Sequence, residues 1–145
     1  MPLFNPDKIT KLISEMRRAI NRLRFLKTLD KKSFLNDPDK IGSAKYNFIV
    51  AIESAIDICN HIISQNGYRA PEDYADTFHV LGEQGAFDKD FIKDLKDMTK
   101  FRNRLIHLYW EVDDEQVYEI LQTRLDDFKT FLNNIAVFLG LERLE

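Results

Sequence analysis

The sequence predicts an all-α fold, an antiparallel bundle of about five helices. Only five glycines and four prolines interrupt the 145 residues, and apolar side chains recur at helical spacing over long stretches. No segment shows the strict alternation of polar and apolar residues that is typical of a half-buried strand. Hydrophobic residues make up 44% of the chain and charged residues 31%, which is typical of a globular protein with a buried core.

The first two expected helices each begin with a capping residue followed by a proline. We expect one helix over residues 6–26, capped by Asn5 and ended by the polar stretch that follows it. A second, longer helix is expected over residues 38–66, with Asp37 as its cap and Gly67 as its stop. The predicted buried stripe of this helix consists of Phe48, Ile49, Ile52, Ile56, Cys59, Ile62 and Ile63.

Three shorter helices complete the expected bundle. The third follows a loop over residues 68–73, and the fourth begins at Asp88 and continues as far as Tyr109. The fifth runs from Asp113 to a stop at Gly140. Short connections between such helices favour an antiparallel arrangement within one domain.

Composition also disfavours several protein classes. No apolar run approaches the roughly 20 residues of a membrane span, and the first residues lack the basic and apolar pattern of a secretory signal. The single cysteine, Cys59, cannot form an internal disulfide or a thiolate metal site by itself. We therefore expect a cytoplasmic protein. The sequence contains no glycine-rich phosphate loop, zinc-binding helix motif or serine nucleophile elbow.

The formal net charge of −3 is unevenly distributed. Residues 1–32 contain nine Lys or Arg and three Asp or Glu, and the rest of the chain is acidic. This basic segment is either the solvated face of a helix or a local binding surface for RNA phosphates or an acidic partner. The acidity of the whole chain argues against broad, non-specific binding of nucleic acid.

A polar motif, Arg-x4-His-x-Tyr, lies at Arg102, His107 and Tyr109. Arginine binds phosphate with a two-pronged fork, and histidine transfers protons near neutral pH; cleavage of an RNA phosphodiester without a metal needs both. On an ideal helix an offset of five residues separates Arg102 from His107 by about 140°, so the two could flank a groove. Tyr109 would return to the face of Arg102, and Asn103 could orient the imidazole from one turn away. A solvated polar helix end is the other interpretation.

A second polar set lies on the long helix. Glu53, Asp57 and His61 follow one another at intervals of four residues, beside the apolar stripe. They form either a carboxylate and histidine set lining the same cleft or a solvated face with a stabilising Asp57–His61 pair. A metal site is the weaker interpretation, and we expect no metal here.

These features resemble the minimal HEPN toxins called HepT along nearly the whole chain. The resemblance is carried by residues 51–63, 71–78 and 98–109, with a matching continuation over 110–118. Arg-x4-His-x-Tyr is the motif of that family. The resemblance implies that residues 1–145 form a single HEPN domain. It also implies a two-fold symmetric homodimer in which the two motifs face one another across a shared cleft.

The resemblance further implies a metal-independent endoribonuclease that needs no cofactor. Arg102 would hold the scissile phosphate, and His107 would act as general base or acid for attack by the RNA 2′-hydroxyl. The product would be a 2′,3′-cyclic phosphate, and DNA would be spared because it lacks that hydroxyl. The supporting residues would be Asn103, Glu53, Asp57 and His61.

The resemblance implies a partner as well, an MntA-like nucleotidyltransferase antitoxin that transfers AMP from ATP onto Tyr109. The AMP group would add bulk and a negative phosphate beside Arg102, and would thereby exclude RNA. The alternative function is a non-catalytic helical substrate-binding or docking subunit of a nucleotidyltransferase. A purely structural bundle leaves the motif unexplained.

Overall fold

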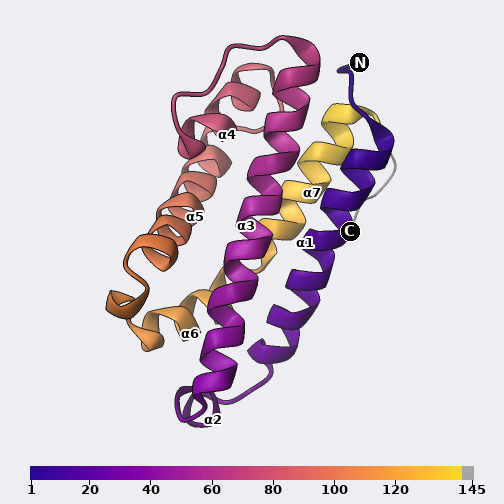
Figure 1. Cartoon of the computed structure of the whole chain (residues 1–145). Helices are drawn as coiled ribbons and strands as arrows, with labels where there is room; N and C mark the ends of the chain where they lie inside the picture. The colour runs from indigo at the N-terminus through magenta and orange to yellow at the C-terminus, as the bar shows by residue number, and fades with distance from the viewer. Residues whose placement is uncertain (142–145) are drawn as a thin grey trace.

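The structure, a computed structural model that describes residues 1–141, is built from helices alone (Figure 1). These residues form seven α-helices and one short 3₁₀ turn, and no strand, so the predicted all-α class is confirmed. The elements are α1 (Pro6–Lys27), α2 (Lys31–Leu35), α3 (Pro38–Asn66), α4 (Tyr74–Glu83), α5 (Lys89–His107), the 3₁₀ turn η1 (Tyr109–Glu111), α6 (Asp114–Thr123) and α7 (Asp126–Leu139). Over residues 1–141, no helix combines the length and the apolar character needed to cross a membrane.

The ends of the helices follow from local chemistry. The side chain of the residue before each of six helices accepts a hydrogen bond from a backbone N–H of the first turn, which would otherwise have no partner. These capping residues are Asn5, Asp30, Asp37, Asp73, Asp88 and Asp113. Gly67 and Gly140 end α3 and α7 in the left-handed conformation, with φ of 64° and 69°, which glycine adopts without steric cost.

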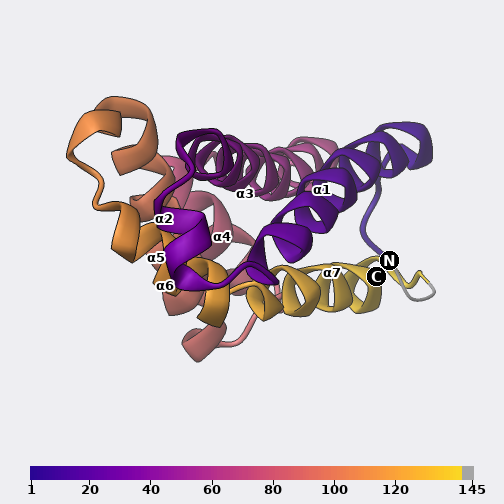
Figure 2. The ribbon, with the colours of Figure 1, turned by 90° about the horizontal axis from the view of Figure 1, so that it is seen from below.

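The long helix α3 is the centre of the fold. Helix α1 packs along one side of it, while α4 and α5 contact its other side (Figure 1). The view from below shows α7 lying under the layer formed by α1 and α3 (Figure 2). The segment before α1 is tied to the end of α3, because the backbone of Leu3 exchanges hydrogen bonds of 2.7 and 2.9 Å with the Asn66 side chain.

Aromatic contacts join these helices into one core. Phe131 of α7 packs edge-on against Phe78 of α4, with ring centroids 6.2 Å apart, and stacks on Phe87 at 5.7 Å. The rings of Phe48 in α3 and Phe101 in α5 meet edge-on at 5.3 Å. This last contact holds α5 against α3 at the residue that precedes Arg102.

The helix count differs from the prediction at two places. The polar stretch over residues 27–33, expected only to end the first helix, overlaps α2, whose Phe34 is fully buried and contacts Tyr118 at a ring separation of 5.6 Å. The expected fifth helix is divided into α6 and α7 at Arg124, which has a non-helical φ of −119°. Five residues are too few to show a helical period, and the apolar spacing of the last segment continues unbroken across the division.

Candidate active site

The side chain of Arg102 in α5 packs against α3, and the residue is only 9% exposed. Its Nη2 donates to Glu53 Oε1 of α3 at 2.8 Å, and its Nη1 donates to Asn103 Oδ1 at 2.9 Å. The guanidinium carbon also lies 4.8 Å from the centre of the Tyr74 ring, at the start of α4. Three elements therefore fix the orientation of this side chain, as a preorganised anion-binding group requires.

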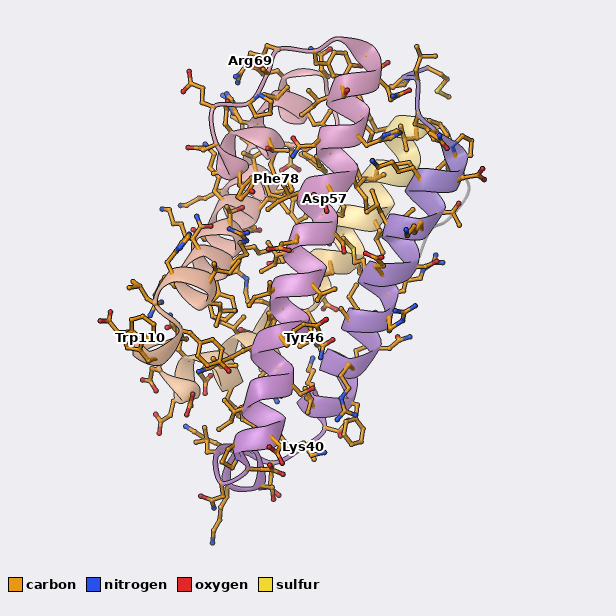
Figure 3. All side chains as sticks on the ribbon, viewed as in Figure 1. Lys40, Tyr46, Asp57, Arg69, Phe78 and Trp110 are labelled. Atoms are coloured by element: carbon orange, nitrogen blue, oxygen red, sulfur yellow. The ribbon has the colours of Figure 1, made fainter. Side chains whose placement is uncertain are left out.

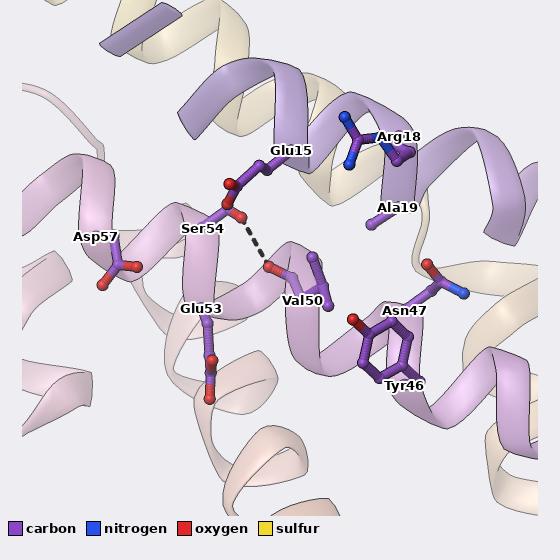
Figure 4. A pocket seen from close by; sticks show the side chains of 9 residues that line it. All are labelled: Glu15, Arg18, Ala19, Tyr46, Asn47, Val50, Glu53, Ser54 and Asp57. Atoms are coloured by element: carbon purple, nitrogen blue, oxygen red, sulfur yellow. Dashed lines mark hydrogen bonds between the residues drawn. The ribbon is translucent and has the colours of Figure 1, made fainter. Parts of the chain in front are cut away.

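The guanidinium borders a hollow of about 120 Å³. Its lining consists of Glu53, Ile56, Asp57, Tyr74 and Arg102. A second, larger groove of about 320 Å³ runs between α1 and α3 and shares Glu53 and Asp57 with the first (Figure 4). Burial, together with the nearby charge of Glu53, raises the pKa of the Asp57 carboxyl. Glu53 and Asp57, the two carboxylates predicted to line the cleft, thus border the same hollow as Arg102.

His107 is the last residue of α5, and its side chain is exposed. The helix ends there because Leu108 adopts φ −131° and ψ 40°, although its N–H still donates to the Arg104 carbonyl. The suggestion that Asn103 orients the imidazole is not what the structure shows, since the Asn103 amide oxygen accepts from Arg102 instead. Asn103 therefore orients the arginine of the motif.

Tyr109 lies outside α5, so the prediction that it returns to the helical face of Arg102 is wrong. The turn η1 carries it onto the first half of α3, where Lys45 Nζ lies 4.3 Å from the centre of its ring. A Cβ atom built on Gly42 would lie 3.9 Å from the tyrosine hydroxyl. Lys45 precedes Glu53 by eight residues, which corresponds to about 12 Å along the helix. Tyr109 thus faces the same helix as Arg102 but at a different level.

The predicted line of polar residues on α3 is divided between two places. His61 is buried, and its Nε2 accepts a hydrogen bond of 2.9 Å from the Asn5 backbone at the start of α1. Burial, with the charge of Lys8, lowers the pKa of His61, which suits this acceptor role. His61 lines a second hollow with Lys8 and does not border that of Arg102, although Asp57 of α3 (Figure 3) borders both. In the part of the chain that the structure describes, no three His, Cys, Asp or Glu side chains are placed to hold a metal.

Two residues of this region were not predicted from the sequence. Tyr74 covers Arg102, and nothing in its local sequence distinguishes it from other helix-starting residues. Lys45 is only 6% exposed and lies on the buried face of α3 between Ala44 and Phe48. A charged residue within an apolar stripe is a signal that sequence reasoning could have used.

The model of the family described as ribonuclease HepT-like matches residues 16–135. The mRNA nuclease HepT of Shewanella oneidensis is 30% identical over 129 residues, which cover 89% of this chain and 96% of that protein. A solved toxin–antitoxin complex with AMP-PNP contains a chain that superposes with a TM-score of 0.84 at 28% identity, covering 90% of this chain and 98% of that one.

A second solved structure is that of the tri-AMPylated Shewanella oneidensis HEPN toxin in complex with the MNT antitoxin. Its matching chain has a TM-score of 0.83 and 29% identity, and the match covers 90% of this chain and 98% of that one. The similarity in sequence and that in structure thus point to the same kind of protein.

Proposed function

The chain belongs to the ribonuclease HepT-like family, and we propose that it is the toxin of a toxin–antitoxin pair, an endoribonuclease that cleaves RNA. The protein acts as a single HEPN domain, without a metal or another cofactor. Its partner is a nucleotidyltransferase antitoxin, by analogy with the complex that contains a tri-AMPylated HEPN toxin.

The observation that carries the proposal is the setting of Arg102. Arg102 is only 9% exposed as a residue, and it borders a polar hollow with each terminal nitrogen donating to one oxygen acceptor. Its Nε has no hydrogen-bond partner among residues 1–141 but is buried, so a phosphate oxygen in the hollow would bind through the terminal nitrogens. A surface ion pair would leave the arginine head in water, which is not the case here.

The proposed chemistry is a transesterification within the RNA. His107 accepts the proton of a 2′-hydroxyl, whose oxygen attacks the adjacent phosphorus. The bond from phosphorus to the 5′-oxygen breaks, the leaving oxygen takes up a proton, and the product carries a 2′,3′-cyclic phosphate. Arg102 stabilises the negative charge that builds on the phosphoryl oxygens, and Asn103 and Glu53 hold its guanidinium in place.

A two-fold homodimer is part of the proposal. Arg102 is buried against α3, whereas His107 at the end of the same helix is exposed. An offset of about 140° around the helix axis separates them, so one subunit presents its two groups in different directions. Two copies facing each other would supply both groups to one cleft, because a two-fold axis brings the same surface of each subunit together.

Tyr109 is the proposed site of AMPylation. The residue is 44% exposed, and it begins the turn η1, with one residue between it and the end of α5, so that a nucleotidyltransferase could reach its hydroxyl. An AMP group there would place a phosphate and a nucleoside at the mouth of the cleft, where they would compete with RNA.

The test is RNA cleavage by Arg102→Ala and His107→Ala, with Arg104→Ala and His79→Ala as controls. Arg104 lies on the same helix and donates to Gln116 at 2.9 Å, and His79 is an exposed histidine of α4. We expect each motif variant to lose at least about 100-fold in cleavage rate, and each control to stay within a few fold.

Two further readouts address the chemistry. Mass analysis of the products should find 2′,3′-cyclic phosphate ends, in the presence of a chelator, and a 2′-deoxy substitution at the cleaved position should abolish the cut. Undiminished cleavage by both motif variants would overturn the assignment. Absence of cleavage by the unaltered protein would favour the alternative, a non-catalytic docking subunit of a nucleotidyltransferase.

A further inference from the structure

Lys45 links η1, the turn after α5, to the long helix α3. Its side chain is 7% exposed, and its ammonium lies 4.3 Å from the centre of the Tyr109 ring. The same nitrogen lies 3.5 Å from the Tyr109 carbonyl oxygen and 3.3 Å from Asp114 Oδ1, at the start of α6. One lysine of α3 thus contacts both the backbone and the ring of Tyr109.

None of these contacts is a short, charge-assisted hydrogen bond, for which an N–O distance of about 2.7–2.9 Å is usual. The Asp114 side chain is 47% exposed, so water can solvate its carboxylate if the ammonium turns away. The Lys45 ammonium therefore remains able to form a shorter and stronger hydrogen bond to an anionic oxygen that reaches it.

Such an oxygen would come from a phosphate on the tyrosine itself. We propose that Lys45 binds the phosphate of an AMP group attached to Tyr109 and so holds the AMPylated turn against α3. An ammonium over the ring is close to a phosphate on its hydroxyl, because that phosphorus is bonded directly to Oη. Gly42 borders the same hydroxyl one turn earlier on α3 and lacks a side chain that would obstruct the group.

This inference rests on the proposed modification of Tyr109. In that step the tyrosine Oη attacks the α-phosphorus of ATP and forms an O–P bond. The bond from the α-phosphorus to the bridging oxygen of the β-phosphate breaks, and pyrophosphate leaves. The phenolic proton passes to a base of the transferase or to water. Lys45 acts on the product, whose phosphodiester keeps one negative charge.

The experiment compares the wild type, Lys45→Met, Lys45→Arg and Lys40→Met, each unmodified and each AMPylated by the cognate nucleotidyltransferase and ATP. Intact mass and peptide mapping establish the extent of modification at Tyr109. Lys40 is the matched control, since it lies on the same helix but contacts the ring of Phe25. The readout is the change in Tm on AMPylation of each protein, so that any cost of the substitution itself cancels.

We expect all four proteins to be modified, and AMPylation to change Tm more favourably in the wild type than in Lys45→Met by about 3 °C or more. Lys45→Arg and Lys40→Met should behave as the wild type. The ³¹P resonance of the native AMPylated protein should move on the Lys45→Met substitution and not on Lys40→Met.

Equal Tm changes and equal ³¹P resonances in the wild type and Lys45→Met would overturn the inference while leaving the modification intact. A Lys45→Met protein that escapes modification would overturn it too, because Lys45 would then act in the transfer. An unmodified Tyr109 in the wild type would refute the proposed regulation and this inference together, even if RNA cleavage were found.

Discussion

The ion pair between Arg102 and Glu53 provides the sharpest quantitative prediction. Its N–O distance is 2.8 Å, and the side chains are 11% and 43% exposed. A hydrogen bond between charged groups contributes about 1.5–3 kcal/mol to stability, and the solvent access of Glu53 places this pair at the lower end. We therefore expect a coupling free energy of about 1.5 kcal/mol between the two side chains.

A double-mutant cycle measures this quantity directly. The cycle consists of Arg102→Ala, Glu53→Ala and the double variant, with the free energy of unfolding taken from urea titrations at pH 7. Arg104 and Gln116 provide the control cycle, because their hydrogen bond has a similar length of 2.9 Å but is exposed and involves only one charge. The control coupling should be about 0.5 kcal/mol or less.

A coupling in the Arg102 cycle no larger than that of the control would refute the reasoning. It would mean that the contacts with Tyr74 and Asn103, and not the carboxylate of Glu53, hold the guanidinium in its buried position. The value also bears on function, since binding of a phosphate through the same nitrogen must compete with Glu53. A coupling of about 1.4 kcal/mol corresponds to a tenfold weaker apparent affinity for the phosphate.

Two predictions concern pH. Because the pKa of His61 is lowered by burial and by Lys8, the folded protein binds fewer protons than the unfolded chain just below pH 6.5. Its free energy of unfolding should therefore fall between pH 7.5 and 5.5, and His61→Ala should reduce that fall; urea midpoints at both pH values test this, and an unchanged slope contradicts it. The pKa of Asp57 is raised by burial and by Glu53, so its carboxylate destabilises the folded state at neutral pH. Asp57→Asn should raise the urea midpoint at pH 7 and leave it unchanged at pH 3, whereas a lower midpoint at pH 7 would show that the charge has a stabilising partner.

Much of the fold could be predicted because residues close in the sequence determine where most helices begin and end. An Asn or Asp followed by proline opens α1 and α3, and Gly67 and Gly140 end helices by a backbone conformation that other residues rarely adopt. The end of α5 could not be predicted in this way. Leu108 is neither glycine nor proline, and its departure from the helix follows from the packing of η1 on α3, a contact between residues far apart in the sequence.

The candidate site was predicted in part for the same reason. Helical spacing correctly places Glu53 and Asp57 on one face of α3, and the family motif singles out Arg102. The spacing also groups His61 with them, although it lies about 12 Å further along the helix than Glu53. Only the tertiary structure reveals that the start of α1 covers that end of the line, so that His61 accepts from the Asn5 backbone.

The spacing of the motif itself now has a physical interpretation. An offset of five residues separates Arg102 from His107 around the helix, which lets the arginine be buried and oriented by α3 while the histidine remains in solvent. Because α5 ends at His107, the next two residues can turn away and place Tyr109 against Lys45. A longer helix would carry the tyrosine back above Arg102 and away from that lysine. The end of the helix is therefore as much a part of the proposed site as its side chains, and a variant that extends α5 past Leu108 would separate Tyr109 from Lys45 without altering either residue.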